Sequence, residues 1–477
     1  MMGPSGANIL VPVAFLSWFP INVFFYKLFD KRFVPIIAYV SGWMFLPCAE
    51  YDIFMLRNTK TTVIGYCLLA AAWIFDQERL KNYEFDKVDI PMIMWCIAPF
   101  FASLFNGLGI YDGLSQTLYQ TIRWGLPYYL GRVYFTDQDV LRAFAIAIFI
   151  GALVYVPFSL VELRMSPQFH RWTYGYSQHN ILQAMRDGGH WRPMIFMDMG
   201  LMTSMWMMLG SILGTWLYIS GLMPKKILSI PSPLLLAVLV LTFFMYLSNA
   251  AIIFFFSGLL VLFVSSKTRK SFLVLVLLSL PYLYVITRIT GYWDGSNLVN
   301  FVEKKISPQR AGSIQFRFEN ETLLINRAMN GTFFGWGGYG RSRVHNDEGK
   351  DETTTDGLWI IAFGTNGFFG LAMLIITIQM PVIILMKRTD PGEWGSRRLA
   401  APAAMAIFIG LTMIDNLLNA MVNPIYMIFS GGVLGMLTGS GTQPMIETGE
   451  LDLMKEISSI YPRFIGNPAS LPSRFIE

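Results

Sequence analysis

Apolar runs of about 20 residues, separated by short polar stretches, recur along most of the chain. A helical run of this length crosses the ~30 Å hydrocarbon core of a bilayer. The pattern therefore predicts an all-α fold, that of a polytopic integral membrane protein with about 12–13 transmembrane helices. The predicted spans are 8–28, 33–50, 61–75, 89–110, 114–132, 139–161, 194–220, 230–247, 249–266, 271–289, 357–386, 399–416 and 419–438.

The composition agrees with this pattern. Of the 477 residues, 54% are hydrophobic and only 14% are charged, whereas soluble domains carry roughly a quarter charged residues. The net charge of +5 is spread along the chain, so no nucleic-acid partner is expected. The start, MMGPSGANIL, has no basic region before its apolar run, and we therefore expect no cleaved signal peptide.

Cysteines and histidines give no indication of a metal site. All three cysteines lie inside apolar runs, where they suit the role of small buried hydrophobic residues. His170, His179 and His190 share one loop, but their spacing does not match a usual zinc site. We expect neither a metal nor a cofactor.

Basic residues cluster in the loops after the first, third, seventh, ninth and eleventh predicted spans. Short basic loops stay on the cytoplasmic side of a membrane, and one orientation satisfies all of these loops, with the amino terminus outside. The chain then divides into ten spans with an exterior loop at 162–193 (1–289), a large exterior loop carrying the site (290–356), three further spans (357–439) and a cytoplasmic tail (440–477).

The two exterior loops hold all four histidines and many arginines, so polar chemistry is expected on this face. Glu162 and Arg164 leave the sixth span, and Arg192 opens the seventh. Arginines at span boundaries commonly reach lipid headgroups, and we weigh that role for Arg192 equally with ligand binding. Inside the predicted spans, Arg123 and Asp198 are the main ionisable residues, and charges there are costly enough to indicate function.

The stretch FFGWGGYGR places Gly335, Gly337 and Gly340 at the G-x-G-x-x-G spacing of dinucleotide-binding loops. That fingerprint needs a preceding strand and a following helix. Here a polar, helix-like stretch precedes the glycines and no helical pattern follows, so no nucleotide cofactor is expected. Two interpretations stay open: a tight turn that brings backbone N–H groups close to another group, or a flexible loop tip.

Upstream, RAGSIQFR places Arg310 and Arg317 seven residues apart, on one face of a helix that the preceding Ser-Pro pair would start. Two guanidinium groups on one face suit a pyrophosphate, because they are planar, always charged and bidentate donors. The alternative is that they pair with Glu319 and Glu321 of the same helix, or with lipid phosphate.

Downstream, Asp356 lies where the large exterior loop enters a span. Together with Thr353 it forms a capping pattern before an apolar run. Its carboxylate is equally suited to act as a general base on a sugar hydroxyl. Both interpretations stay open.

Several motifs follow one another in order: Arg192-Pro193 at the start of a span, RAGSIQFR, FFGWGGYG, and G-x-x-G-F-F-G-L in the next span. In this order they resemble the superfamily of O-antigen ligases and of O-antigen and exopolysaccharide polymerases. The resemblance covers most of the chain in topology and 307–371 in motif. It implies a GT-C-like bacterial inner-membrane protein whose active site faces the periplasm.

The resemblance further implies a metal-independent glycosyltransferase whose donor is an undecaprenyl-pyrophosphate-linked oligosaccharide and whose acceptor is a glycan, with a chain-length regulator as an optional partner. The candidates for binding pyrophosphate are Arg192, Arg310, Arg317 and Arg341. The candidate catalytic residues are Asp356 and His345, and the supporting candidates are Glu162, Arg164, His179 and Arg123.

In the ligase branch a His-Asn pair commonly leads into the span after the large loop. Here Thr355-Asp356-Gly357 occupies that position, and His345-Asn346 lies ten residues earlier. This departure favours a polymerase over a ligase. A flippase or transporter of lipid-linked glycan is a further hypothesis, but transporters place polar sites near the midplane, whereas the ionisable residues here concentrate in the exterior loops.

Overall fold

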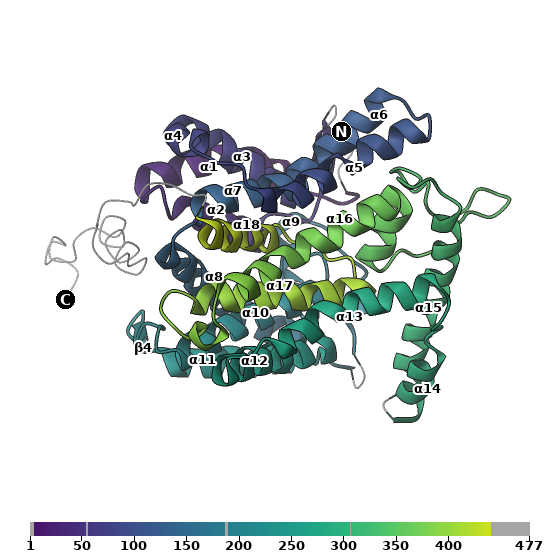
Figure 1. The fold of residues 1–477 in the computed structure, drawn as a ribbon. Coiled ribbons are helices and arrows are strands. Elements are labelled where there is room, and N and C mark those ends of the chain that lie inside the picture. Colours follow the sequence, from purple (N-terminus) through teal and green to yellow (C-terminus); the bar gives the residue numbers. More distant parts are fainter. Residues whose placement is uncertain (1–3, 54–55, 187–188, 306, 440–477) are drawn as a thin grey trace, which may run out of the picture.

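The computed structural model describes residues 4–53, 56–186, 189–305 and 307–439, and the predicted cytoplasmic tail lies outside this part of the chain. The chain is almost entirely helical (Figure 1). Its β-structure within the described ranges consists of short hairpins: β1 (Glu50–Ile53) with β2 (Leu56–Thr59), and β3 (Lys226–Ile227) with β4 (Ile230–Pro231).

Seven helical segments of the described chain are long and apolar enough to cross a bilayer. They are α1 (Leu10–Leu28), the segment Lys87–Phe105 that includes α5 (Ile90–Phe105), α8 (Gln138–Met165), α12 (Asn249–Thr268), α13 (Phe272–Ile289), α16 (Leu358–Arg388) and α17 (Ala400–Leu418). The protein is therefore a multi-pass membrane protein, as the apolar runs predicted.

Every other predicted span also contains helix. These elements are α2 (Val34–Phe45), α3 (Lys60–Phe75), α6 (Ile110–Gln120), the π-helical turn η2 (Thr121–Gly125), α7 (Leu126–Tyr134), α10 (Gly200–Ile219), α11 (Ser232–Met245) and α18 (Pro424–Thr438). The predicted span 194–220 starts too early, because α10 begins only at Gly200. Asp198 consequently lies in the loop before the helix and is exposed.

The loops between these helices carry shorter elements. They are α4 (Gln77–Lys81), α9 (Phe169–Tyr174), the 3₁₀ turns η1 (Lys87–Asp89), η3 (Ile181–Ala184) and η5 (Pro391–Glu393), α14 (Ser296–Lys305) and α15 (Pro308–Met329). α14 and α15 lie together at one end of the bundle, on the right in Figure 1, while α4 and β4 lie at the other end.

α17 lies at the centre of the bundle, with 89% of its apolar window buried, whereas α1, α12 and α13 bury only 28–33% of theirs. The outer helices therefore turn apolar faces outwards, as helices in contact with lipid do. α7 and α18 pack closely because glycines face each other: a Cβ on Gly131 would lie 2.4 Å from the Ile428 carbonyl oxygen. Small residues at such crossings let backbones approach within membranes.

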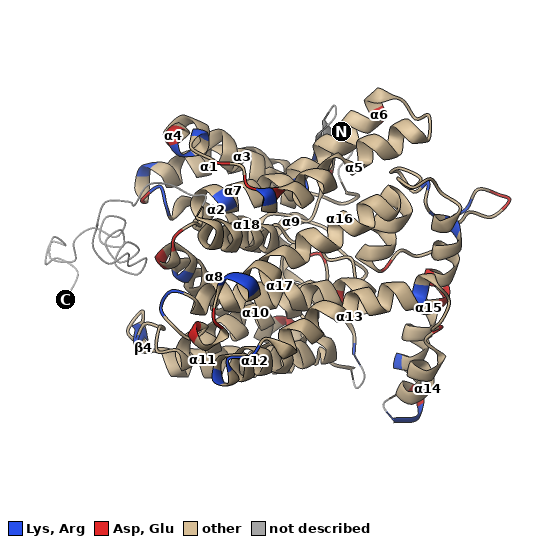
Figure 2. Cartoon of the chain, viewed as in Figure 1, with Lys and Arg blue, Asp and Glu red and all other residues tan. Residues whose placement is uncertain are grey.

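Charged residues gather mostly at the helix ends and in the loops, and Figure 2 shows few along the middle of the bundle. A buried charge pair at such helix ends joins the last turn of α7 to the segment before α5: Arg132 pairs with Asp89 at 2.9 Å, and both side chains are almost fully buried. The Tyr128 hydroxyl donates a further hydrogen bond to Asp89, so this charge pair is well satisfied.

Candidate functional site

The glycine-rich loop packs against a break in α16. At Gly367 the backbone leaves the helical conformation, with φ +64°, and carbonyl groups of the preceding turn lose their helical partners. The N–H groups of Trp336 and Gly337 donate to the carbonyls of Gly364 and Thr365, each at 2.9 Å. The loop is therefore a tight, packed turn, and the group it approaches is the broken helix.

Glycine is required where this loop meets the helix. Gly335 has φ +80°, and a Cβ there would lie 2.4 Å from the backbone nitrogen of Gly367. The neighbouring Trp336 stacks under the guanidinium of Arg327 at 3.8 Å and donates its indole N–H to the Arg327 carbonyl. These contacts join the loop to both α15 and α16.

The predicted arginine helix is α15, which begins at Pro308 after Ser307, as the sequence indicated. A buried charge network fixes its position. Glu321 pairs with Arg288 of α13 at 3.1 Å, and it also accepts hydrogen bonds from Tyr284 and from the Trp359 indole. The alternative in which Arg310 and Arg317 pair with Glu321 of their own helix is therefore not found in the structure.

Arg317 of α15 pairs with Asp356, with 3.5 Å between Nε and Oδ2, and both side chains stay partly exposed. The capping interpretation of Asp356 is wrong, because α16 has Gly357 as its N-cap and no side-chain cap. The Thr353 hydroxyl instead accepts from the Val344 N–H.

The Arg317–Asp356 pair lies where α15, the start of α16 and the end of α17 meet. The charge of Arg317 also acts on Asp415 of α17. Leu358 donates its N–H to the carbonyl of Asn419, just beyond α17. A Cβ on Gly357 would lie 2.4 Å from the Leu417 carbonyl oxygen, so the backbone after Asp356 is held tightly against this helix end.

Arg192 and Arg310 come together from the two predicted exterior loops. Arg192 is only 4% exposed. Its side chain lies over Gly200, where a Cβ would be 2.7 Å from it, and its Nε makes a long contact of 3.5 Å with the Tyr246 carbonyl. Burial and the nearby charges of Arg186 and Arg310 lower the pKa of Arg192 to about 9.

This group of three arginines, Arg186, Arg192 and Arg310, has an excess of positive charge. The ion pairs of the described residues include neither Arg192 nor Arg310. A small cavity of about 70 Å³ opens beside Arg186 and Arg192, and His179 also lines it. Positive charges in such proximity repel one another, and an anion between them would offset both this repulsion and the lost hydration of the buried Arg192.

Glu162 holds the loop that presents Arg192. Its buried carboxylate accepts backbone N–H groups from Gln168 and Phe169 on one side, and from Met194 and Ile195 on the other, at 2.8–2.9 Å. Each carboxylate oxygen of Glu162 therefore accepts two backbone hydrogen bonds, and the residue positions the loop.

His170 is a second anchor of this loop and is almost completely buried. Its Nε2 accepts the Cys48 N–H, and its Nδ1 lies 3.0 Å from the Tyr176 carbonyl oxygen, to which it donates. Burial lowers the pKa of His170 to about 4. The ring is therefore neutral and structural at physiological pH.

Three predicted residues lie elsewhere on the described surface. Arg341 pairs with Asp112 of α6 at 3.1 Å. Arg164 is exposed at the end of α8. His345 is exposed on a hairpin, where its backbone bridges to Asp351. The structure does not bring these side chains into the Arg186–Arg192–Arg310 group.

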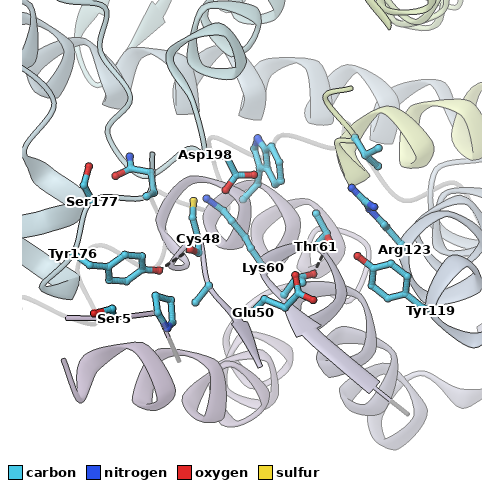
Figure 3. Close-up of a pocket in the computed structure, with 16 residues that line it drawn as sticks. Ser5, Cys48, Glu50, Lys60, Thr61, Tyr119, Arg123, Tyr176, Ser177 and Asp198 are labelled. Carbon is cyan, nitrogen blue, oxygen red and sulfur yellow. Dashed lines mark hydrogen bonds between the residues drawn. The ribbon is translucent and has the colours of Figure 1, made fainter. Parts of the chain in front are cut away.

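A larger cavity of about 560 Å³ lies between the start of α1, the β1–β2 hairpin, the π-helical turn and the loop before α10 (Figure 3). Arg123 lines it, together with Lys60, Tyr119 and Asp198. Lys60 was not predicted, since a lysine at the start of an apolar run is usually a boundary residue. Its burial within the protein could not be read from that position.

Among the described residues, no group of three histidine, cysteine, aspartate or glutamate side chains is placed to hold a metal ion. The three cysteines carry free thiols. The chain matches no known family model, and no curated protein matches its sequence. The resemblance to O-antigen ligases and polymerases therefore depends on the order of a few motifs alone.

Proposed function

We propose that this protein is a glycosyltransferase of the bacterial inner membrane that polymerises undecaprenyl-pyrophosphate-linked repeat units into O-antigen or exopolysaccharide. In this proposal the chain has thirteen spans, the amino terminus lies outside, and the loops around α9 and α15 face the periplasm. The basic loops on the opposite face support this orientation.

The observation that carries the proposal is the meeting of Arg192 with Arg310, neither of which has an ion pair within the described part of the chain. A diphosphate carries multiple negative charges and planar sets of acceptor oxygens, which guanidinium groups bind bidentately. An arginine cluster at the ends of membrane helices suits a lipid-linked diphosphate, whose headgroup stays at the interface while its chain remains in the bilayer.

The position of Asp356 suits this residue to act as the catalytic base. Arg310 and Arg317 are two turns apart on α15, about 10 Å along the helix axis. A sugar attached to a diphosphate at Arg310 would therefore extend towards the Arg317–Asp356 pair. The Asp356 carboxylate would take the proton of the acceptor hydroxyl as its oxygen attacks the anomeric carbon, and the bond to the lipid pyrophosphate would break.

The proposed reaction needs no nucleotide, because the lipid pyrophosphate is itself a good leaving group. The arginines would stabilise the charge that develops on it, and positioned cations of this kind typically contribute about 10²–10³ in rate. The protein would also align the acceptor hydroxyl with the anomeric carbon.

The test uses purified full-length protein in liposomes with an undecaprenyl-pyrophosphate oligosaccharide and neither nucleotide nor added metal. We expect longer lipid-linked glycans with the wild type and about 100-fold slower growth with Arg192→Gln or Arg310→Gln. Arg171→Gln changes an exposed arginine of the same exterior region, is the matched control and should keep full activity.

Other outcomes assign other functions. If no glycan grows until a lipid A core is added, the protein is a ligase. If no transfer occurs but labelled lipid-linked glycan crosses the liposome membrane, it is a flippase. Growth that is equal in wild type and both arginine variants would remove the pyrophosphate role from this cluster.

A further inference from the structure

The cavity of about 560 Å³ beside α3 lies within the size range of small-molecule sites. It takes no part in the proposed pyrophosphate or base chemistry. Its walls come from the described ends of several helices, and Figure 3 shows side chains from them pointing into a common space. A ligand in this cavity would contact the amino-terminal third of the chain and the loop that carries Arg192.

Four charged side chains line the cavity, and all but Arg123 interact with a group of opposite charge: these three are Glu50, Lys60 and Asp198. Lys60 donates to the Phe196 carbonyl at 2.6 Å and interacts with the charge of Asp198. Glu50 pairs with Arg57 at 3.7 Å. Arg123 has neither an ion pair nor a hydrogen bond among the described residues.

The π-helical turn between α6 and α7 presents Arg123 to the cavity. Its guanidinium lies 5.8 Å from the ring centre of Tyr119, and its Nε is buried without a partner. π-helical turns are rare and occur frequently at functional sites. A buried donor on a charged group without an acceptor is costly, and a carboxylate ligand would satisfy it.

The remaining lining groups suit a saccharide. The Tyr176 and Ser177 hydroxyls and the Gln178 amide N–H groups already donate to backbone carbonyls. The hydroxyl oxygens, the amide oxygen and the two carboxylates can accept hydrogen bonds from sugar hydroxyls, and the tyrosine rings offer faces for stacking. The groups concerned are Ser5, Thr59, Thr61, Ser177, Gln178, Glu50, Asp198, Tyr119 and Tyr176. Such a mixture, with one uncompensated arginine, matches a sugar chain that bears a carboxylate.

The cavity is connected to the candidate site through two backbone segments. Tyr176, Ser177, Gln178 and Asp198 line it from the loop that also carries Arg192. Val422 lines it from the stretch after α17, whose Asn419 carbonyl accepts the Leu358 N–H next to Asp356. A glycan held in the cavity would therefore contact the loop that carries Arg192 and the segment that follows α17.

We propose that this cavity binds an acidic sugar of the acceptor glycan, with its carboxylate on Arg123. The acceptor role rests on the proposed function, whereas binding itself can be measured without turnover. The cavity then selects repeat units that contain a uronic acid over neutral ones.

The test is isothermal titration calorimetry with purified full-length protein in detergent, in the absence of the lipid-linked donor. The probes are tetragalacturonate, a hyaluronan tetrasaccharide, maltotetraose and inorganic phosphate. We expect at least one acidic oligosaccharide to bind at least about tenfold more tightly than maltotetraose, and Arg123→Gln to remove that preference. Thr61→Trp, which fills the cavity, should abolish binding, while Arg171→Gln, at an exposed arginine of α9, should leave it unchanged.

The outcomes separate this inference from the proposed function. Arg310→Gln should bind the acidic probe normally while losing chain growth. Acidic binding without chain growth in the wild type would overturn the polymerase and keep the cavity assignment. Equal affinity for maltotetraose, no binding of either acidic probe, an intact preference in Arg123→Gln, or full competition by phosphate would overturn the cavity assignment.

Discussion

Arg288 and Arg192 have the same exposure, 4%, and opposite surroundings. Arg288 pairs with Glu321 at 3.1 Å and donates to the carbonyls of Phe318 and Asp294. Arg192 has one long contact with the Tyr246 carbonyl and the positive charge of Arg310 nearby. Burial is therefore the same for the two arginines, and what distinguishes them is the sign of the surrounding charge.

The comparison assigns different roles to two arginines at the same end of the molecule. A buried cation with a carboxylate and several carbonyl partners stabilises the fold, and its removal leaves the carboxylate buried without an opposite charge. A buried cation among cations opposes folding, and its presence requires another explanation. Under the proposed function, that explanation is the lipid pyrophosphate.

The largest effect is expected for Glu321→Gln. The substitution leaves the Arg288 charge buried without its carboxylate, which should lower the free energy of unfolding by about 3–5 kcal/mol. The measurement is thermal unfolding in detergent, followed by tryptophan fluorescence. Glu319→Gln removes an exposed carboxylate from the same helix and is the control. Equal losses in both variants would show that the network is not an anchor.

His170 should make the stability of the Arg192 loop depend on pH. The unfolded chain binds a proton near pH 6.5, whereas burial holds the folded pKa at about 4. Stability is therefore present above pH 6.5 and falls as the pH drops towards 4, by roughly 3 kcal/mol in all. Melting temperatures at pH 7 and pH 5 measure this. His170→Gln should reduce the difference, and His179→Gln should preserve it.

The substitution Gly335→Ala tests whether the glycine-rich loop packs as firmly against α16 as Arg288 packs against α15. Both Gly335 and Gly349 have positive φ, but only Gly335 has backbone within van der Waals distance of an added Cβ. Gly349→Ala therefore measures the conformational strain alone. We expect Gly335→Ala to cost roughly 1–3 kcal/mol more in thermal unfolding. Similar losses would mean that the loop does not pack against α16 in solution.

Arg192→Met should have a stability effect of the opposite sign to Glu321→Gln. Methionine keeps the packing over Gly200 and removes a buried charge that is repelled by Arg310. We expect the melting temperature to stay the same or to rise, equivalent to about 1 kcal/mol or less, while glycan growth is lost. A marked drop in melting temperature would make Arg192 a structural residue like Arg288.

The smallest stability effect is expected for Asp356→Asn. The Arg317–Asp356 pair is partly exposed, and such pairs contribute about 0–1 kcal/mol. Thermal unfolding should therefore change little, so that any loss of glycan growth in the same preparation reports on chemistry. Unchanged growth would exclude Asp356 as the base.

Local patterns were enough to predict that the apolar runs are helical and where the arginine helix begins, because hydrophobic periodicity and helix-start residues act over a few positions. The helix start at Ser307 and Pro308 is one example. The partner of Glu321 was not predictable in this way. Arg288 lies on another helix, and only the packing of α13 against α15 brings the two charges together.

The glycine loop was predicted as a tight turn or a flexible tip, and its partner could not be named. The acceptors at Gly364 and Thr365 lie on a later helix. A signal was present nonetheless, since Gly364 and Gly367 sit inside an apolar run and indicate a break with unsatisfied carbonyls. No comparable sequence pattern indicated the cavity of about 560 Å³, because its walls come from segments spread over the whole chain.

Glu162 works as a non-covalent crosslink. Its two carboxylate oxygens fix Gln168 and Phe169 at one end of a loop and Met194 and Ile195 at the other. The segment between these points is a closed loop whose ends stay in place whatever its length, and the entropic cost of lengthening such a loop grows only slowly. Exchanges of the exposed side chains of Leu182 and Gln183 would therefore leave these anchors in place, together with the bond from the Arg192 N–H to the Ala184 carbonyl. The protein can in this way change what the loop contacts while keeping its anchored arginine, which makes this segment a natural place for new substrate preferences to arise.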